Sequence, residues 1–345
     1  MTAHAEPVGF AGRHRQDYRE LLTEMRRLGL LDRQYGFYFR LVTLILGGWA
    51  AAWLLLVVTG DSWIQLLVAA FFGFLSAHTA FLCHDAGHRQ IFRSPRLNDA
   101  LGLFHGDLLL GMSYGWWVEK HNRHHTHPNQ LGKDPDISIK ALAFTPEQAK
   151  SKESVYRSIT RHQDRLLPLL LMCEGVHIHL AGFREIFVRR GRRWPVEAAF
   201  DLVHVVVYLT VLFSVLEPGR ALAFIVVHKA LTGLYLGCVF APNHKGMPVL
   251  DEHEQAEFLY RQTVTSRNLR WPRLADGLLA GVNFQIEHHL FPSMPRNNLR
   301  RAQPIVRTFC QQRGYPYKES AIGEMLGEIR GNLVAMARPL RDRSA

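Results

Sequence analysis

Four long apolar runs dominate the chain and predict membrane-spanning helices. Residues 41–60 and 63–83 form one pair of runs, and residues 200–216 and 221–241 form a second. About 20 apolar residues are needed to cross the hydrocarbon core of a bilayer. A buried helical hairpin in a soluble core is the alternative, but these runs are long and come in pairs. We therefore expect an all-α integral membrane protein with two transmembrane helical hairpins, or four spans.

Short turns at residues 61–62 and 217–220 join the runs of each pair, so both chain termini should lie on the same side of the membrane. The turns carry almost no basic residues, whereas the flanks of the hairpins are rich in arginine. Because basic loops stay in the cytoplasm, we expect the N-terminal segment 1–40, both termini and a helical cap to be cytoplasmic, on the cell (inner) membrane.

The formal net charge of +11 is explained by this topology and by anionic lipid headgroups, so we expect no nucleic-acid partner. Residues 1–40 are polar and predict no cleavable signal peptide. The four cysteines are scattered and suggest reduced thiols. Two weaker apolar segments, residues 97–117 and 166–183, contain polar side chains and are interpreted as interfacial or half-inserted helices.

Histidines recur in three short strings in the predicted cytoplasmic part of the chain. Residues 121–125 (HNRHH) and 285–289 (QIEHH) place histidines three and four residues after a metal-capable side chain, and residues 84–88 (HDAGH) carry the i, i+4 pair. On a helix these spacings lie on one face. Imidazole binds iron, zinc, copper and nickel, and the set is too large for one four-coordinate zinc. The strings therefore predict a di-metal site held by His84, His88, His121, His124, His125, His288 and His289.

The strings HDAGH, HNRHH and QIEHHLFP resemble the three histidine boxes of the membrane fatty acid desaturase family, in order and over most of the chain. The Gln that begins the third box resembles the acyl-lipid and front-end branch. We expect a desaturase domain over residues 41–345. Front-end members often carry a fused cytochrome b5 domain with a His-Pro-Gly-Gly heme motif, and the chain departs from them because it has neither that motif nor room for the domain before residue 41. The resemblance implies two iron ions (Fe2+/Fe3+), O2 as co-substrate, and His244 near the end of the last run as an eighth ligand.

Several residues are expected to support the site without binding metal. Gln285 is interpreted as orienting a ligand imidazole, although its amide oxygen is also a possible weak ligand. Asn243 and Asp85 are further supporting candidates. Tyr114, Trp116 and Trp117 precede the second box. They either line the tunnel for the acyl chain or belong to an ordinary belt of aromatic residues at the membrane interface. The remaining histidines are interpreted as hydrogen-bonded side chains rather than ligands: His78, His105, His177, His179 and His204.

The expected function is O2-dependent insertion of a cis double bond into a fatty acyl chain presented as acyl-CoA or acyl-lipid. Attack on an unactivated methylene needs two electrons from outside, and the chain has no nicotinamide, flavin, heme or iron–sulfur motif. We therefore expect a separate electron donor, either a ferredoxin-type protein or an NAD(P)H-dependent reductase. A membrane di-iron hydroxylase or ketolase is the nearest alternative, and a non-catalytic membrane metal-binding protein is the second.

Overall fold

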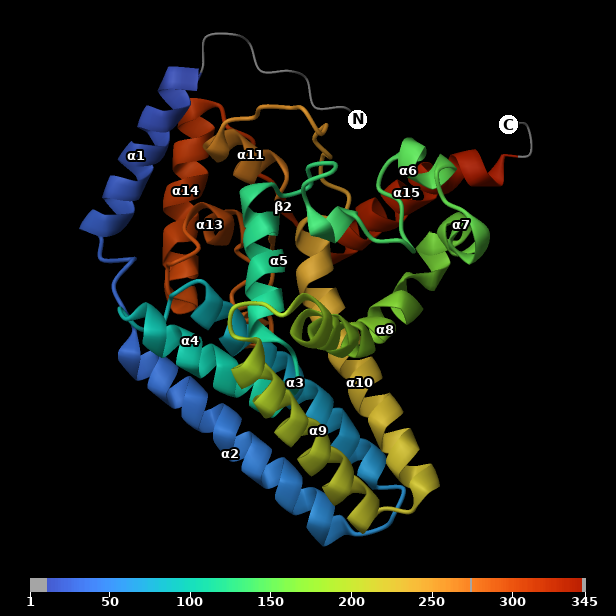
Figure 1. Ribbon diagram of the computed structural model, residues 1–345. Helices are drawn as coiled ribbons and strands as arrows, with labels where there is room; N and C mark the ends of the chain where they lie inside the picture. Colours follow the sequence, from blue (N-terminus) through green and yellow to red (C-terminus); the bar gives the residue numbers. More distant parts are fainter. Residues whose placement is uncertain (1–10, 274, 343–345) are drawn as a thin grey trace. The chain divides into compact units, whose positions relative to one another are not determined.

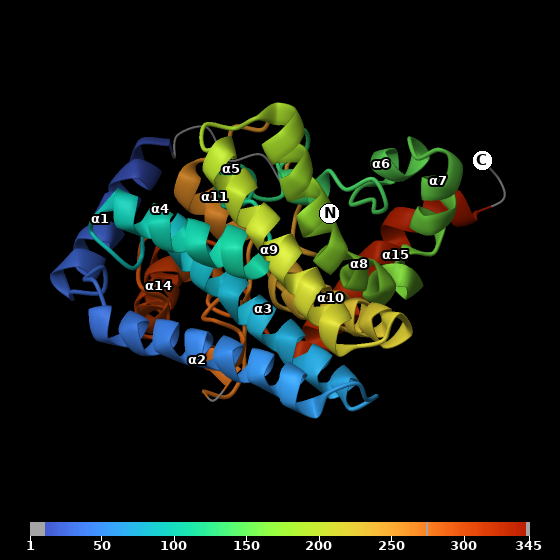
Figure 2. The same ribbon diagram turned by 60° about the horizontal axis from the view of Figure 1, so that its bottom comes forward.

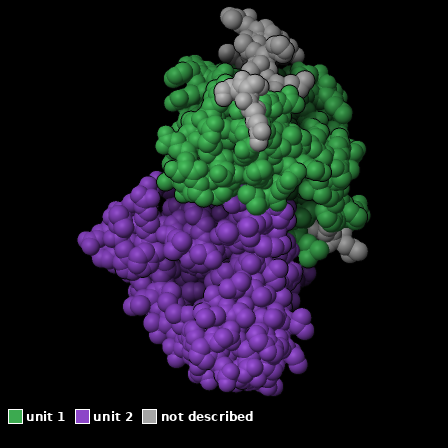
Figure 3. Space-filling model, turned by 90° about the vertical axis from the view of Figure 1, so that its right-hand side faces the viewer, with its two compact units in different colours: residues 1–32, 120–167, 239–345 green, residues 33–119, 168–238 purple. Residues whose placement is uncertain are grey.

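The computed structural model describes residues 11–273 and 275–342, and these are mostly helical. The chain divides into two compact units (Figure 3): residues 1–32, 120–167 and 239–345 form unit 1, and residues 33–119 and 168–238 form unit 2. The first ten residues of the predicted N-terminal segment lie outside the described residues. The rest of that segment contains helix α1 (Ala11–Arg27) and the start of α2.

Unit 2 is built on four long helices that run alongside one another (Figures 1 and 2). They are α2 (Tyr35–Thr59), α3 (Gln65–Gly87), α9 (Trp194–Val215) and α10 (Pro218–Phe240). Each contains nearly all of one of the predicted apolar runs, which confirms the runs as helices. The helix α2 begins at Tyr35 rather than at residue 41, because the aromatic segment before the run already belongs to the helix.

The two hairpin turns of unit 2 are bonded to each other. The Arg220 guanidinium donates hydrogen bonds to both carboxylate oxygens of Asp61, with Nε 2.6 Å from Oδ1. The same Oδ1 accepts a hydrogen bond from the backbone N–H of Glu217 at 3.1 Å. Both turns therefore lie at one end of the four helices, as the paired apolar runs predicted.

Apolar side chains of these helices face both inward and outward. Phe72, Leu82 and Phe224 are fully buried in the core of unit 2. On the outer face Leu44 and Val58 are each 73% exposed, and the outward side of α9 is lined with leucine and valine. A soluble monomer rarely leaves so much apolar surface in contact with water. This pattern is what a helix bundle surrounded by lipid requires.

Among the described residues, five helices are long and apolar enough to cross a membrane, where the sequence analysis counted four. The additional one is α8 (Gln163–Arg184), continued by a π-helix η3 (Glu185–Arg189), and it contains the weaker segment 166–183. The other weak segment is divided between α4 (Pro95–Leu103), a π-helix η1 (Phe104–Leu110) and the start of α5 (Tyr114–Thr126). Gly111, with φ of 71°, ends η1 and separates it from α5.

Helices α8 and α10 approach each other closely at two glycines. A Cβ at Gly175 would lie 1.9 Å from the carbonyl oxygen of Lys229, and one at Gly233 would lie 2.4 Å from the backbone nitrogen of Gly175. No side chain fits between backbones at this separation. In Figure 1 the C-terminal half of α8 is seen nearly end-on, whereas the four long helices are seen from the side.

Several histidines inside unit 2 that were not predicted to bind metal are hydrogen-bonded. His105, His179 and His204 each use Nδ1 to donate to a backbone carbonyl of the segment 101–111. His228, for which the sequence offered no explanation, is bonded at both ring nitrogens, to Ser76 at 2.9 Å and Tyr208 at 2.7 Å. The Lys229 ammonium lies 5.2 Å from the centre of the Tyr208 ring.

Unit 1 contains shorter helices and one pair of two-residue strands. Around the core residues Leu21, Ile286 and Val306 pack α1, α11 (Phe258–Val264), α13 (Gln285–Leu290) and α14 (Leu299–Arg313). The strands β1 (Asn268–Leu269) and β2 (Glu319–Ser320) pair in parallel. The remaining helical elements are η2 (Pro135–Ile137), α6 (Pro146–Lys150), α7 (Ser154–Arg161), η4 (Ala241–Asn243), α12 (Ala275–Leu278), η5 (Arg296–Asn298) and α15 (Ile322–Arg341).

Candidate metal centre

The second and third histidine strings both lie on helices of unit 1, as their spacing predicted. The second string occupies the end of α5, and the third forms most of α13. Adjacent histidines in each string point in different directions, because neighbouring residues on a helix are about 100° apart. As a result each string supplies ligands to two separate groups, rather than aiming all its imidazoles at one point.

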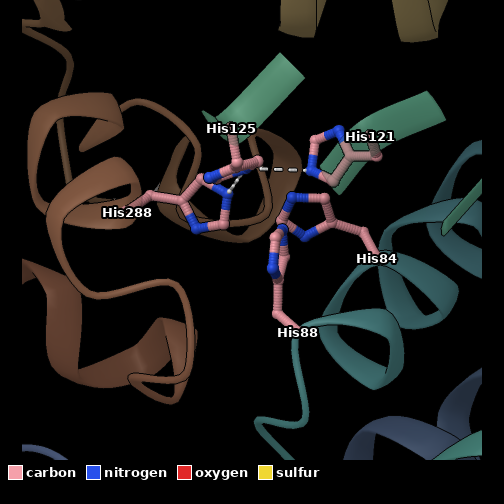
Figure 4. Close-up of side chains that lie close together, drawn as sticks. All are labelled: His84, His88, His121, His125 and His288. Atoms are coloured by element: carbon pink, nitrogen blue, oxygen red, sulfur yellow. Dashed lines mark hydrogen bonds between the residues drawn. The ribbon is translucent and has the colours of Figure 1, made fainter. Parts of the chain in front are cut away.

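The first group of unit 1 consists of His121, His125 and His288. Nε2 of His125 lies 3.0 Å from Nε2 of His121 and 3.1 Å from Nε2 of His288. Figure 4 shows both separations as dashed lines, with His121 and His125 on α5 and His288 on α13. One ring nitrogen from each residue lies within 4.8 Å of the others. We call this group the first trio.

The second group, the second trio, consists of His124, His244 and His289, all of which are buried. Each uses Nδ1 to bond an oxygen acceptor: His124 bonds the Asp134 carboxylate at 3.0 Å, His244 the Thr265 carbonyl at 3.0 Å, and His289 the Gln262 amide oxygen at 2.8 Å. A proton held on Nδ1 leaves the Nε2 lone pair available for a metal. All three imidazoles are therefore in the tautomer that a metal site needs.

The separations within both trios match those of ligands on one metal ion. Metal–imidazole bonds of about 2.0–2.1 Å place two nitrogens about 2.9 Å apart at a right angle and about 3.4 Å apart at a tetrahedral angle. The Nε2 atoms of His124 and His244 are 3.2 Å apart, inside this range. The pure imidazole donor set suits iron, zinc, copper or nickel. The residues present thus fit two metal positions within unit 1.

The electrostatic surroundings of His124 and His244 in the second trio shift their pKa values in opposite directions. Burial by itself would lower the pKa of His124, but the charge and hydrogen bond of Asp134 raise it. Burial, followed by the charge of His124, lowers the pKa of His244. The two imidazoles thus differ in the group bonded to Nδ1, which is a carboxylate at His124 and a backbone carbonyl at His244.

The two trios lie next to each other. The rings of His125 and His289 stack with their centroids 4.1 Å apart and their planes at 13°. Gln262 links the trios at the same place, because its amide nitrogen donates to the backbone carbonyl of His125 at 2.9 Å while its oxygen accepts from His289. The two trios therefore form one continuous cluster of imidazoles.

Gln285 and Asn243, predicted to support the site, are bonded to each other beside the second trio. The Asn243 amide nitrogen donates to Gln285 Oε1 at 3.2 Å and to the Val239 carbonyl at 3.0 Å. This turns the Gln285 amide nitrogen toward His244 Nε2, at 2.9 Å. Gln285 is therefore on the metal side of His244, with a hydrogen-bond donor rather than an oxygen directed at it.

Glu287, directly before the histidine pair of α13, anchors that helix. Its carboxylate accepts hydrogen bonds from Tyr317 at 2.6 Å and from Asn268 at 2.7 Å, and the Asn268 side-chain oxygen accepts from the backbone N–H of Ile286 at 3.0 Å. Burial raises the pKa of Glu287 to about 7 despite these hydrogen bonds. The parallel pairing of β1 with β2 supplies Asn268 and so fixes α13.

The first histidine string lies in unit 2 at the C-terminal end of α3. His84 and His88 project from this end (Figure 4), with ring centroids 4.7 Å apart. Asp85 is fully buried, and its carboxylate is 3.4 Å from Nδ1 of His84. Of the predicted acyl-chain residues, Trp117 lies 5.7 Å from the His84 ring, measured between centroids, and Tyr114 is buried against Gly102.

Sequence reasoning missed two residues that hold imidazoles of the second trio. Gln262 and Thr265 lie at the end of α11, in a segment with no histidine and no recognisable motif. Their partners are 27 and 21 residues away along the chain. Asp134 carried a signal, because Asp134-Pro135-Asp136 follows the second string, but that pattern also fits an ordinary turn.

Comparison with known proteins agrees with the histidine strings. Residues 61–321 match the fatty acid desaturase family. An acyl-lipid (9-3)-desaturase of Physcomitrium patens is 31% identical over 251 residues, which are 70% of this chain and 47% of the relative. A fatty acid desaturase 2-like protein of Mus musculus is 28% identical over 328 residues, covering 91% and 65% of the two chains, respectively. A Delta(8)-fatty-acid desaturase of Helianthus annuus is 28% identical over 323 residues, covering 88% and 69%.

The chain thus spans about half the length of the moss relative and slightly less than two thirds of the mouse relative. The matched region extends from the turn of the first hairpin, at Asp61, to the start of the last helix. It contains all three histidine strings and His244. With two trios of imidazoles in unit 1 and this match over most of its length, the chain belongs to the fatty acid desaturase family.

Proposed function

We propose that this protein is an O2-dependent di-iron desaturase that inserts a cis double bond into a fatty acyl chain carried as acyl-CoA or acyl-lipid. The observation that carries the proposal is the pair of adjacent imidazole trios in unit 1, in a chain that belongs to this family. When bound, two irons would supply an oxidation by O2 that hydrolytic metal centres do not perform. The overall change is –CH2–CH2– + O2 + 2e− + 2H+ → –CH=CH– + 2H2O.

The eight histidines predicted from the sequence are the proposed ligands. His124, His244 and His289 would hold one ion, and His121, His125 and His288 would contribute to the other. We propose that His84 and His88 complete the first position, because the i, i+4 spacing of their string is typical of a ligand pair and matches the first histidine box. Neutral imidazole ligands leave open coordination positions when fewer than six are bound.

The protein residues contribute orientation and exclusion of water. Burial of the second trio keeps bulk water from its Nε2 atoms, and the three Nδ1 hydrogen bonds hold the rings in place. Orientation of the substrate selects the reacting carbons, since only the methylenes held near the metals react. Tyr114, Trp116 and Trp117 are the proposed acyl-chain contacts.

We infer four membrane spans, α2, α3, α9 and α10, with the histidines on the cytoplasmic side of the inner membrane. The steep crossing of α8 over α10 supports an interfacial position for α8, although its composition alone would allow a span. Cysteines introduced at Ser62 and Gly219 should react with an impermeant label from outside. Cysteines at Lys133 and Arg300 should react only after permeabilisation, and external labelling at Arg300 would overturn this topology.

An external electron donor is part of the proposal, because two electrons are consumed for each double bond. An acidic ferredoxin-type protein or an NAD(P)H-dependent reductase would suit the arginine-rich cytoplasmic segments, and raised salt should slow turnover. Purified enzyme with acyl substrate, O2 and NADPH should be inactive until such a carrier is added. Sustained turnover from NADPH alone would contradict this expectation.

The activity itself is tested by expression in a host without desaturases, followed by mass spectrometry of the fatty acids. A new monounsaturated or more unsaturated acyl chain is expected, and His124→Ala should abolish it while the protein still inserts. The matched control is His105→Ala, which removes a buried imidazole bonded only to the Leu101 carbonyl. A hydroxylated or ketone product would indicate the alternative chemistry, and a metal-bound protein without product would indicate a non-catalytic role.

A further inference from the structure

The loop that follows the second histidine string carries two buried polar side chains, Asn129 and Asp134, neither of which is a proposed metal ligand. Asn129 is 2% exposed and Asp134 is not exposed at all. Polar groups in the interior of a protein are costly unless their hydrogen bonds are satisfied. Their bonding therefore shows what this loop is built to hold.

The Asp134 carboxylate collects hydrogen bonds from three directions. It accepts from Nδ1 of His124, which lies 3.0 and 3.1 Å from its two oxygens. It also accepts from the backbone N–H groups of Asn129 at 2.7 Å and Asp136 at 2.8 Å. Among the imidazoles of the described residues, Asp134 bonds only His124. The carboxylate is thus fixed by its own loop and acts on one metal ligand.

Asn129 extends the same loop to a second ligand of the second trio. Its amide nitrogen donates to the backbone carbonyl of His244 at 3.0 Å and to that of Pro248 at 3.2 Å. Its backbone carbonyl accepts from the N–H of Leu250 at 2.9 Å. The backbone at His244 and in the residues that follow it is therefore tied to the loop that carries Asp134. Asn129 adopts φ of 52°, a left-handed conformation that asparagine tolerates better than most residues.

We propose that Asn129 and Asp134 are positioning residues that together set the affinity of the metal position at the second trio. Asp134 orients His124 and strengthens it as a donor, and Asn129 fixes the distance between the backbones that carry His124 and His244. Because the loop acts on two ligands of one trio, its loss should weaken one metal position and leave the other nearly unchanged. This inference rests on the proposed di-metal function and identifies the residues that set the metal affinity of one of the two positions.

The proposal is tested by titrating the full-length, metal-free protein in detergent with Co(II). Binding is followed by calorimetry and by the visible absorption of the bound ion, neither of which requires activity. The wild type should bind two ions. In Asp134→Asn, one of the two should bind about 10–100-fold more weakly, as is typical when a hydrogen-bond partner of a ligand is lost. Its absorption spectrum should change for that ion only.

In Asp134→Asn the new amide NH2 group would face backbone N–H groups, and the resulting repulsion would disturb the loop. A second variant therefore tests the same inference without changing Asp134. Asn129→Gly removes the bonds to the His244 and Pro248 carbonyls, and glycine adopts the left-handed backbone without strain. It should weaken the same ion. The control Glu174→Gln neutralises the carboxylate of an exposed carboxylate–imidazole pair, 3.1 Å from His177, and should leave both affinities at wild-type values.

Each outcome decides the inference. Wild-type affinities for both ions in Asn129→Gly, or equal weakening of both ions in Asp134→Asn with unchanged circular dichroism, would overturn it while leaving the di-metal centre intact. A third ion in the wild type that Asp134→Asn removes would make Asp134 a ligand, in the group His124, Asp134 and Asp136, and would also overturn it. A wild type that binds fewer than two ions would overturn the proposed centre itself.

Discussion

Replacing Gln285 by alanine separates a metal ligand from a residue that supports one. Gln285 is 3% exposed and touches the second trio through its amide nitrogen, 2.9 Å from Nε2 of His244. Its oxygen is occupied by the Asn243 amide, which donates to it at 3.2 Å. An amide NH2 group has no lone pair to offer a metal. We therefore predict that Gln285→Ala keeps both metal ions.

The magnitude of the effect follows from which bonds are lost. After the substitution Asn243 still donates to the Val239 carbonyl at 3.0 Å, and in the metal-bound protein Nε2 of His244 is taken by the ion. No buried group is left unsatisfied by the loss, so folding should be little affected. The polar side chain beside the metal-bound His244 is lost, and loss of such a neighbour of a ligand typically costs about 10–100-fold, or about 1.4–2.8 kcal/mol in the barrier.

The assay combines metal analysis of the purified protein with mass spectrometry of the acyl product. The expected result is two ions per chain and a product rate reduced by one to two orders of magnitude. Gln148→Ala is the matched control, because Gln148 also makes a pair of amide hydrogen bonds, to Phe144 and Ile137, away from the trios. It should retain the wild-type rate. Loss of one ion per chain in Gln285→Ala would refute the reasoning and make Gln285 a ligand.

Three further predictions concern metal removal, helix packing and pH. Stripping the metals with a chelator should lower the melting temperature in detergent, and Fe(II) should restore it, because an ion that binds only the folded state stabilises it; an unchanged melting curve would count against buried metal positions. Gly175→Ala should destabilise the protein by about 1–3 kcal/mol or more in thermal unfolding, because the added Cβ would lie 1.9 Å from the Lys229 carbonyl oxygen. Gly47→Ala is the control and should be neutral or stabilising, because a Cβ there meets nothing within 4 Å. Burial, and to a smaller extent two neighbouring carboxylates, raise the pKa of Asp107 to about 9. The stability that Asp107 contributes to the folded protein is therefore complete below its unfolded pKa of 3.8, and it is lost as the pH rises from there through 9. Asp107→Asn should therefore gain melting temperature relative to the wild type as the pH is raised from 5 to 9, and a constant difference would contradict the shift.

Local pattern determined a large part of this protein. The four apolar runs became α2, α3, α9 and α10, because a run of about 20 apolar residues has few other ways to satisfy its backbone. The histidine strings lie on helices as their i, i+3 and i+4 spacing required. The runs and the strings depend on neighbours within one or two helical turns. His244 was instead indicated by the resemblance to the desaturase family, and it joins His124 and His289.

Tertiary structure alone decided how the ligands are shared and held. The sequence shows His124 next to His125 and His288 next to His289, but only the packing of α5 against α13 assigns one of each pair to each trio. Gln262 carries no motif, yet it connects both trios. Asp134 fits an ordinary turn, and Asn129 shows no role until the chain brings residues 244–250 against it. Sequence periodicity reports contacts along one helix, whereas these hydrogen bonds join residues from 10 to 137 positions apart, and only the folded chain fixes such distances.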